Sequence, residues 1–312
     1  MSSQEFKKRV LFLGIPDMAY ICLEGLFEAG VNIVGVVGPK KNHATFNAFK
    51  HFVLQRDLNF INYDDLKNIF FINKIKALKA DIAVVCSFNY KVPKALLESV
   101  KDGFINVHPS LLPKYRGPNP YSRTILNGEK ETGVTLHFMD ENFDTGDIIT
   151  QRKVEISDVE TMGTLFNRTN VLAFEMLFEI LKEYELKELP RYKQPEGNFE
   201  LGNLFQEDEL VIDFDKPAKE IDCLIRALNP FVLARTNFRQ TLTKILTAEV
   251  VEQSYTGKFL PGEIVKIEND KIFVSTGEGL IAFTSMQFGS FFAGTSKEFI
   301  KILGPKIGEK FE

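Results

Sequence analysis

Two polar side chains with complementary chemistry lie at the end of a short apolar run. Residues 104–107 read FINV and His108 follows, so Asn106 and His108 are two positions apart. Side chains two apart on a strand point to the same face. An amide can donate a hydrogen bond to an oxyanion, and an imidazole can accept or supply a proton near neutral pH. The pair therefore indicates chemistry at a carbonyl group.

A third candidate, Asp144, begins the run DTGD at residues 144–147. A turn there can fold back over the strand ends, and a carboxylate beside an imidazole orients it and stabilises its charged form. Each residue also has an ordinary explanation: Asn106 as a cap, His108 as a buried or surface histidine, Asp144 as a turn residue. Together they predict a catalytic trio.

The elements that must position this trio form an alternating pattern. Short apolar runs predict strands, and the segments between them show helical periodicity or open at a proline. This pattern indicates an α/β fold with a mostly parallel, Rossmann-like sheet covered on both faces. Ligands bind such sheets at the carboxyl ends of the strands, where Asn106 and His108 fall. The predicted strands are residues 10–14, 33–38, 82–86 and 104–107, and the predicted helices are residues 18–30, 64–80 and one starting at Pro93.

The pattern changes in the second half of the chain. Strands are predicted at 134–139 and 148–156, and a long helix at 161–186. Residues 190–203 are polar and read as a linker. After a helix at 217–228, short strand-like runs divided by glycine predict a small β-barrel or open sheet. The predicted domains are therefore residues 1–205 and 206–312.

Composition narrows the class of protein. The chain has 312 residues, a formal net charge of -4 and three widely spaced cysteines. Without a basic excess there is no global attraction to nucleic acid, and the cysteines fit a reducing cytoplasm better than a disulfide framework. Cys86 is better explained as a buried apolar residue than as a nucleophile. The opening GIPD lacks the glycine triad of dinucleotide sites, and no apolar run is long enough to span a membrane.

Three motifs carry a resemblance to a known family. They are NVHPSLLPKYRG at residues 106–117, NGEKETGVT at 127–135 and MDENFDTGD at 139–147. The chain closely resembles the folate-dependent formyltransferases, which include enzymes for methionyl-tRNA and for amino-sugar nucleotides. The opening VLFLGIPDMA at 10–19 and EIDCLIRALNP at 220–230 extend the resemblance over nearly the whole chain.

The resemblance implies a fold, a co-substrate and a set of site residues. It implies an OB-like C-terminal domain and 10-formyltetrahydrofolate as donor, with no metal, and Asn106, His108 and Asp144 match the family's catalytic trio. The resemblance leaves open whether the chain forms a homodimer. The family's pterin-binding positions correspond here to Phe88, Tyr90, Val92, Asp140, Asn142 and Phe143.

The acceptor amine is harder to predict. Residues 39–46, PKKNHATF, lack the arginine and glycines that the tRNA enzymes carry after their second strand, and residues 115–120, YRGPNP, resemble the sugar enzymes better. The sequence thus favours an amino-sugar nucleotide, of the 4-amino-4-deoxyhexose type. Lys114, Arg116 and Arg123 would bind its diphosphate, unless they are solvated surface residues. A methionyl-tRNA formyltransferase and a formyltetrahydrofolate hydrolase are the alternatives.

Overall fold

The computed structural model describes residues 6–251 and 259–312, and the chain divides into two compact units. The first unit takes the chain up to Pro120, then Glu131–Glu155 and Asn167–Gly202. The second takes Tyr121–Lys130, Ile156–Phe166 and everything from Asn203 onward. The division into domains at residues 1–205 and 206–312 stays a prediction. A single boundary in the sequence cannot assign Tyr121–Lys130 and Ile156–Phe166 to the second unit.

The first unit is built on a seven-stranded sheet of order β3-β2-β1-β4-β5-β6-β7. Strands β1 to β5 pair in parallel, whereas β6 and β7 are antiparallel to their neighbours. The predicted α/β class and mostly parallel sheet are confirmed. The strands are β1 (Val10–Gly14), β2 (Ile33–Val37), β3 (Phe60–Ile61), β4 (Ile82–Cys86), β5 (Phe104–His108), β6 (Glu131–Phe138) and β7 (Ile148–Glu155).

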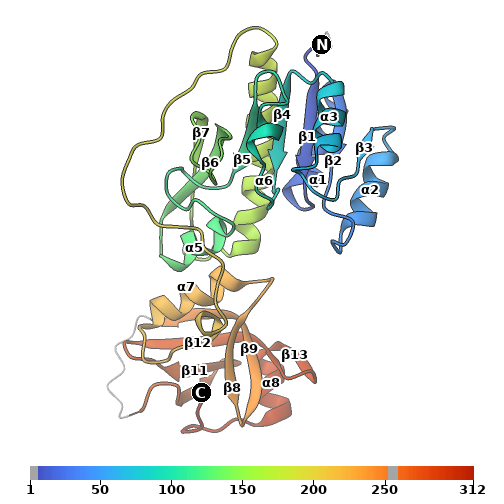
Figure 1. Ribbon diagram of the computed structural model, residues 1–312. Coiled ribbons are helices and arrows are strands. Elements are labelled where there is room, and N and C mark those ends of the chain that lie inside the picture. The colour runs from blue at the N-terminus through green and yellow to red at the C-terminus, as the bar shows by residue number, and fades with distance from the viewer. Residues whose placement is uncertain (1–5, 252–258) are drawn as a thin grey trace. The chain divides into compact units, whose positions relative to one another are not determined.

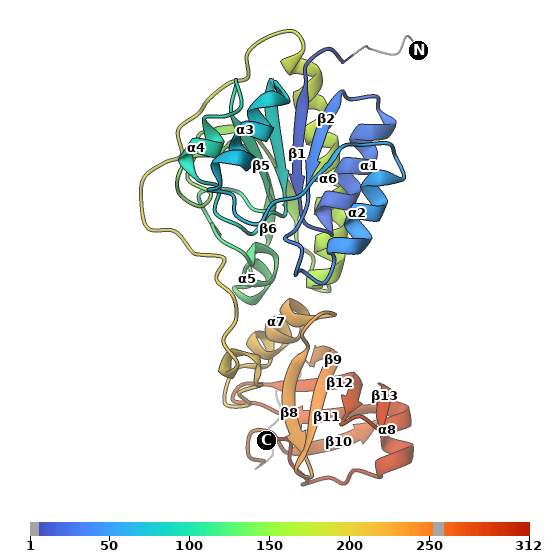
Figure 2. The same cartoon turned by 45° about the vertical axis from the view of Figure 1, so that its right-hand side comes forward.

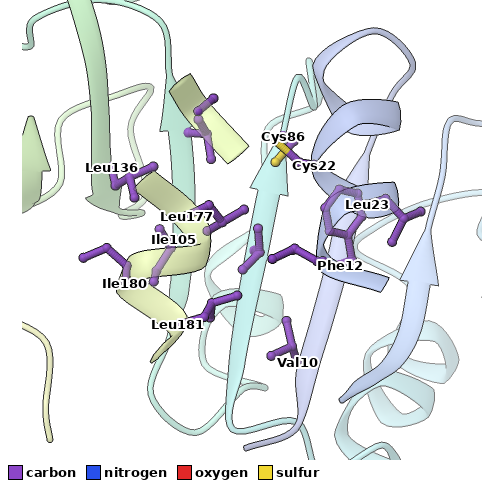
Figure 3. Packing of buried hydrophobic residues seen from close by; sticks show 14 of the residues in the cluster. Val10, Phe12, Cys22, Leu23, Cys86, Ile105, Leu136, Leu177, Ile180 and Leu181 are labelled. Carbon is purple, nitrogen blue, oxygen red and sulfur yellow. The ribbon is translucent and has the colours of Figure 1, made fainter. Parts of the chain in front are cut away.

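Helices cover both faces of this sheet (Figures 1 and 2). Alternate residues of β1 point to opposite faces: Phe12 packs with α1 and α6, and Leu13 packs in the cluster that includes α3 and α4. Figure 3 shows the first of these cores, with Phe12 beside Leu23. The fully apolar strands follow from this two-sided burial. The helices are α1 (Met18–Glu28), α2 (Phe46–Leu54), α3 (Ile69–Ala77), α4 (Lys94–Leu97) and α6 (Met162–Tyr184).

Two helices of the first unit differ from the expectation. Helix α2 lies in a stretch for which the sequence predicted no helix. Helix α3 begins at Ile69 rather than near residue 64, because the Asn68 side chain caps it by accepting a hydrogen bond from Phe70 N at 2.8 Å. Within the described residues, no helix has the length and apolar character needed to cross a membrane.

The second unit is an antiparallel sheet of order β10-β11-β12-β9-β8, with β13 paired to β12. Helices α7 and α8 pack against it. Helix α8 starts at a capping box formed by Thr295 and Glu298, which the sequence analysis missed. The elements are α5 (Pro120–Leu126), α7 (Ala218–Leu228), β8 (Ala234–Phe238), β9 (Thr241–Val251), β10 (Ile264–Glu268), β11 (Lys271–Ser275), β12 (Leu280–Phe288), β13 (Phe292–Thr295) and α8 (Ser296–Leu303).

The chain's last residues join the two edges of this sheet. Asn237 N, on β8, donates to Glu312 O at 2.7 Å, and Ile264 N, on β10, donates to Glu309 O at 2.7 Å. The terminal segment thus pairs with both edge strands and closes the sheet, which favours the small barrel over the open sheet that the sequence analysis had also allowed. Buried phenylalanines, including Phe238 and Phe311 with ring centroids 4.8 Å apart, fill its interior.

Candidate active site

The site begins at the carboxyl end of β5, where the sheet changes from parallel to antiparallel. Asn106 and His108 both lie on β5, between β4 and β6. Asn106 is half-buried and His108 is buried, with 4% of its surface exposed.

Asp144, in the loop between β6 and β7, meets both side chains. Asn106 Nδ2 donates to Asp144 Oδ1 at 3.1 Å, and His108 Nδ1 lies 3.6 Å from the same oxygen. The other carboxylate oxygen accepts from the Gly117 N–H at 2.9 Å. The structure therefore brings together the three residues that the sequence singled out.

Histidine 108 has a defined tautomer because of its second contact. Its Nε2 lies 2.9 Å from the carbonyl oxygen of Tyr115. A carbonyl oxygen only accepts, so Nε2 carries a hydrogen. In the neutral ring the free lone pair is then on Nδ1, the atom that faces Asp144.

The ionisation of the pair follows from burial and from these contacts. Burial lowers the pKa of His108, although Asp144 and the Tyr115 carbonyl act in the opposite direction. Burial alone would raise the pKa of Asp144, but His108, His137 and the Gly117 N–H together hold it below its usual range. These directions favour an ionised carboxylate beside a neutral imidazole.

A second histidine, His137 on β6, completes the cluster. It is buried, its Nε2 lies 3.1 Å from Asn106 Nδ2 and 3.6 Å from Asp144 Oδ1, and its Nδ1 donates to Phe138 O at 2.8 Å. Sequence reasoning missed it because a single histidine in an apolar strand carries no spacing signal. The available signal was pairing: His137 lies opposite Asn106 in the β5–β6 register.

The six residues proposed from family resemblance to bind folate lie around one pocket beside the trio. Phe88, Tyr90, Val92, Asp140, Asn142 and Phe143 line it, and Asn106, His137 and Asp144 line it too. Aromatic rings form one wall, with Phe88 and Tyr90 edge to face at 5.2 Å. The opposite wall is the loop from Asp140, whose carboxylate accepts from Asn142 N at 2.9 Å and Thr145 Oγ1 at 2.7 Å.

The pocket's walls suit a flat heteroaromatic ring, but its volume is about 40 Å³. Pockets for small ligands span roughly 300–1,000 Å³, so wall side chains have to move to admit a pterin. Phe143, with 57% of its surface exposed, is an aromatic wall residue that is free on its outer side. Among the described residues, no group of three histidine, cysteine or acidic side chains could hold a metal ion.

The three cations predicted to bind the acceptor do not all belong to one unit. Lys114 is exposed, and Arg116 donates to Gln194 Oε1 from Nη2 at 2.6 Å. Arg123 belongs to the second unit, where its Nη1 lies 2.6 Å from Glu209 Oε1 and its guanidinium lies over the Phe205 ring. Acceptor binding by these residues stays a prediction.

Comparison with known families agrees with this arrangement. The formyl transferase family matches residues 22–181, and the formyl transferase C-terminal domain family matches residues 204–303. The first match contains β5, the trio and the loop of Asp144. The second contains most of the closed barrel.

Similar proteins cover almost the whole chain. The methionyl-tRNA formyltransferase of Clostridioides difficile (strain 630) is 34% identical over 89% of this chain and 92% of its own. That of Pelotomaculum thermopropionicum (strain SI) is 36% identical over 92% of this chain and 96% of its own. A solved structure of WlaRD, a sugar 3N-formyl transferase with dTDP and 5-N-formyl-THF, superposes with a TM-score of 0.66 at 23% identity. It covers 88% of this chain and 97% of that protein. This chain belongs to the folate-dependent formyltransferase family.

Proposed function

We propose that this formyltransferase transfers the formyl group of 10-formyltetrahydrofolate to the amino group of methionyl-tRNA. The observation that supports methionyl-tRNA as the acceptor is the similarity to methionyl-tRNA formyltransferases. Their identity is 34–36% over about nine-tenths of the chain, through both units. The sequence pattern favoured an amino-sugar nucleotide, so this proposal adopts what was the alternative acceptor.

The geometry of His108 supports its role as the base. The uncharged amine attacks the formyl carbon, the new C–N bond forms, and the carbonyl electron pair moves to oxygen. His108 Nδ1 takes the proton that the amine nitrogen loses, and Asp144 Oδ1, 3.6 Å away, stabilises the imidazolium. The imidazolium then returns the proton to N10 of the folate as the C–N10 bond breaks. The products are the formamide and tetrahydrofolate, and His108 is neutral again.

Asn106 supplies the oxyanion donor in this scheme. Its amide nitrogen has two hydrogens, and its present partners are Asp144 and His137, each at 3.1 Å. One of these hydrogens has to turn to the oxyanion when the substrate binds. A donor of this kind contributes about 3–4 kcal/mol to lowering the barrier.

Two other functions share the trio. The stretch YRGPNP at residues 115–120 favours an amino-sugar nucleotide, while the likeness to a solved sugar enzyme at 23% identity concerns the fold alone. A hydrolase would use water in place of the amine and release formate. The trio does not distinguish the three functions, because each passes through a tetrahedral intermediate at the same carbon.

Binding experiments at several salt concentrations test the acceptor. Binding of charged initiator tRNA should weaken linearly on a log–log plot of affinity against salt, because phosphate contacts release counterions. Uncharged initiator tRNA and a dTDP-linked amino sugar serve as comparisons. No measurable binding of charged tRNA at low salt, together with saturable binding of the sugar nucleotide, would overturn the proposed acceptor.

A further inference from the structure

The segment predicted as a linker is hydrogen-bonded to the rest of the first unit along much of its length. Residues 192–202, here called the strap, follow α6 in the yellow part of the trace (Figure 1). Tyr192 and Ile148 exchange main-chain hydrogen bonds at 2.7 and 2.8 Å. At its other end, Glu200 O accepts from Tyr115 N at 2.6 Å. The strap therefore pairs with the start of β7 at one end and with the loop of Tyr115 at the other.

One side chain of the strap, Gln194, holds the Asp144 loop directly. It is half-buried in a segment that is mostly exposed. Its Nε2 donates to the main-chain oxygens of Asp144 at 2.8 Å and Gly146 at 2.9 Å. Its Oε1 accepts from Arg116 Nε at 3.1 Å and Nη2 at 2.6 Å. Guanidinium only donates and carbonyl oxygen only accepts, so the amide has a single satisfactory orientation and all of its hydrogen-bonding groups are used.

The backbone that Gln194 holds is strained. Asp144 has a φ of 57°, and Tyr115, whose carbonyl receives the His108 bond, has a φ of 59°. Residues other than glycine adopt this left-handed region at an energetic cost and keep it only where the surroundings enforce it. In both cases a main-chain group of the strained residue is bonded to the strap: Asp144 O to Gln194 and Tyr115 N to Glu200.

We propose that Gln194 is a positioning residue, which clamps the strained Asp144 backbone so that the carboxylate stays against His108 and Asn106. The inference rests on the proposed role of the trio and is independent of the acceptor. It also gives Arg116 a function: its guanidinium fixes the Gln194 amide, which in turn fixes the loop. Arg116 then acts through Gln194 rather than by binding the acceptor.

Two substitutions at Gln194 distinguish its bonds to the Asp144 loop from its bond to Arg116. Gln194→Leu keeps the size and neutrality of the side chain and removes every hydrogen bond. Gln194→Glu keeps the acceptor for Arg116 but places a carboxylate against two carbonyl oxygens. The matched control is Gln55→Leu, since Gln55 is an exposed glutamine of the same unit that follows α2.

The readouts are the kcat and KM of formyl transfer, the melting temperature, and the pKa of His108 from NMR titration of labelled histidine. The charged and titratable groups facing His108 are Asp144, His137 and Arg116. Without the clamp, Asp144 moves from the imidazole, so the pKa of His108 should fall and kcat should drop about 10- to 100-fold. The KM for the acceptor should stay near that of the wild type, as should all values for Gln55→Leu.

The possible outcomes distinguish a failure of the inference about Gln194 from a failure of the proposed function. A folded Gln194→Leu protein with wild-type kcat and an unchanged His108 pKa would overturn the positioning role. Failure of both Gln194 variants to fold would also overturn it, because the contact would then be purely structural. If the wild type itself transfers no formyl group, the proposed function is wrong, while the NMR titration still decides whether Gln194 positions Asp144.

Discussion

His108 donates from Nε2 to the main-chain carbonyl of Tyr115 at 2.9 Å, and this bond decides which nitrogen of the neutral ring keeps a free lone pair. With Nε2 protonated, Nδ1 is the ring nitrogen that can act as the proposed base, and it lies 3.6 Å from Asp144 Oδ1. The Tyr115 carbonyl is in turn placed by a left-handed backbone that the strap holds. The geometry of the proposed catalytic trio thus depends on main-chain groups of a loop as well as on the three side chains.

Replacing His108 by alanine should abolish formyl transfer and leave folate binding nearly intact. The change removes the base and the proton donor to N10, which together account for about 10²–10⁴-fold in rate. The measurement is the initial rate of transfer together with the dissociation constant of the folate. His51→Ala, an exposed histidine on α2, is the control and should keep wild-type activity. Full activity in the His108 variant would contradict the assigned role.

The pKa of His108 should lie below the usual value of about 6.5, because burial disfavours the charged ring. Neutral imidazole is the active form, so the activity that depends on it is lost as pH falls through this pKa. Folding stability falls in the same direction, since the unfolded chain binds the proton more readily. Asp144→Asn removes the group that raises the pKa and should lower it further. A pKa of 6.5 or more by NMR titration, or a rise in this variant, would refute the electrostatic account.

Asp140→Ala should raise the KM for 10-formyltetrahydrofolate with little change in melting temperature. The Asp140 carboxylate holds one wall of the proposed folate pocket through Asn142 N and Thr145 Oγ1. Without these bonds the wall loses its order, whereas the exposed loop contributes little to the stability of the fold. Asp65→Ala is a close control, because Asp65 caps Lys67 N in the same way at an exposed turn. An unchanged KM would place the folate elsewhere.

Arg123→Ala should destabilise the second unit and leave the acceptor KM unchanged. Arg123 lowers the pKa of Glu209 to about 2, so the pair stabilises the fold above the ordinary glutamate pKa and loses this effect as pH falls toward 2. The melting temperature should drop at pH 7 by at least about 3 °C, and by less at pH 3. The exposed pair of Lys297 and Asp270 is the control, where Lys297→Ala should cost about 1 °C at most. A raised KM without a change in melting temperature would support acceptor binding by Arg123.

The sequence was most informative where burial is two-sided. Strands β1, β4 and β5 are apolar because both faces of the sheet are covered, so their positions follow from composition alone. The predicted helix at residues 64–80 is longer than α3, because the buried Leu66 continues the helical periodicity before the helix begins. Helices α5 and α8 are only seven and eight residues long, and the sequence analysis missed both, although α8 is strongly amphipathic and begins at a capping box.

The same contrast applies to the site. Asn106 and His108 were found because strand spacing places them on one face, and Asp144 because its motif is specific. Gln194 was missed because it lies in a polar segment with no regular structure, fifty residues from Asp144. Its contacts depend on how the strap pairs with β7 and with the loop of Tyr115. Long-range main-chain pairing of this kind leaves no periodic signal in a sequence.

The most direct test is to mix the protein with 10-formyltetrahydrofolate and, separately, methionyl-tRNA and a panel of 3- and 4-amino-sugar nucleotides, and to analyse the products by mass spectrometry. The account predicts formyl-methionyl-tRNA and tetrahydrofolate in equal amounts, with no product when His108 is alanine. A formylated sugar nucleotide as the only product would contradict the proposed acceptor, and free formate with no formylated amine would contradict formyl transfer itself.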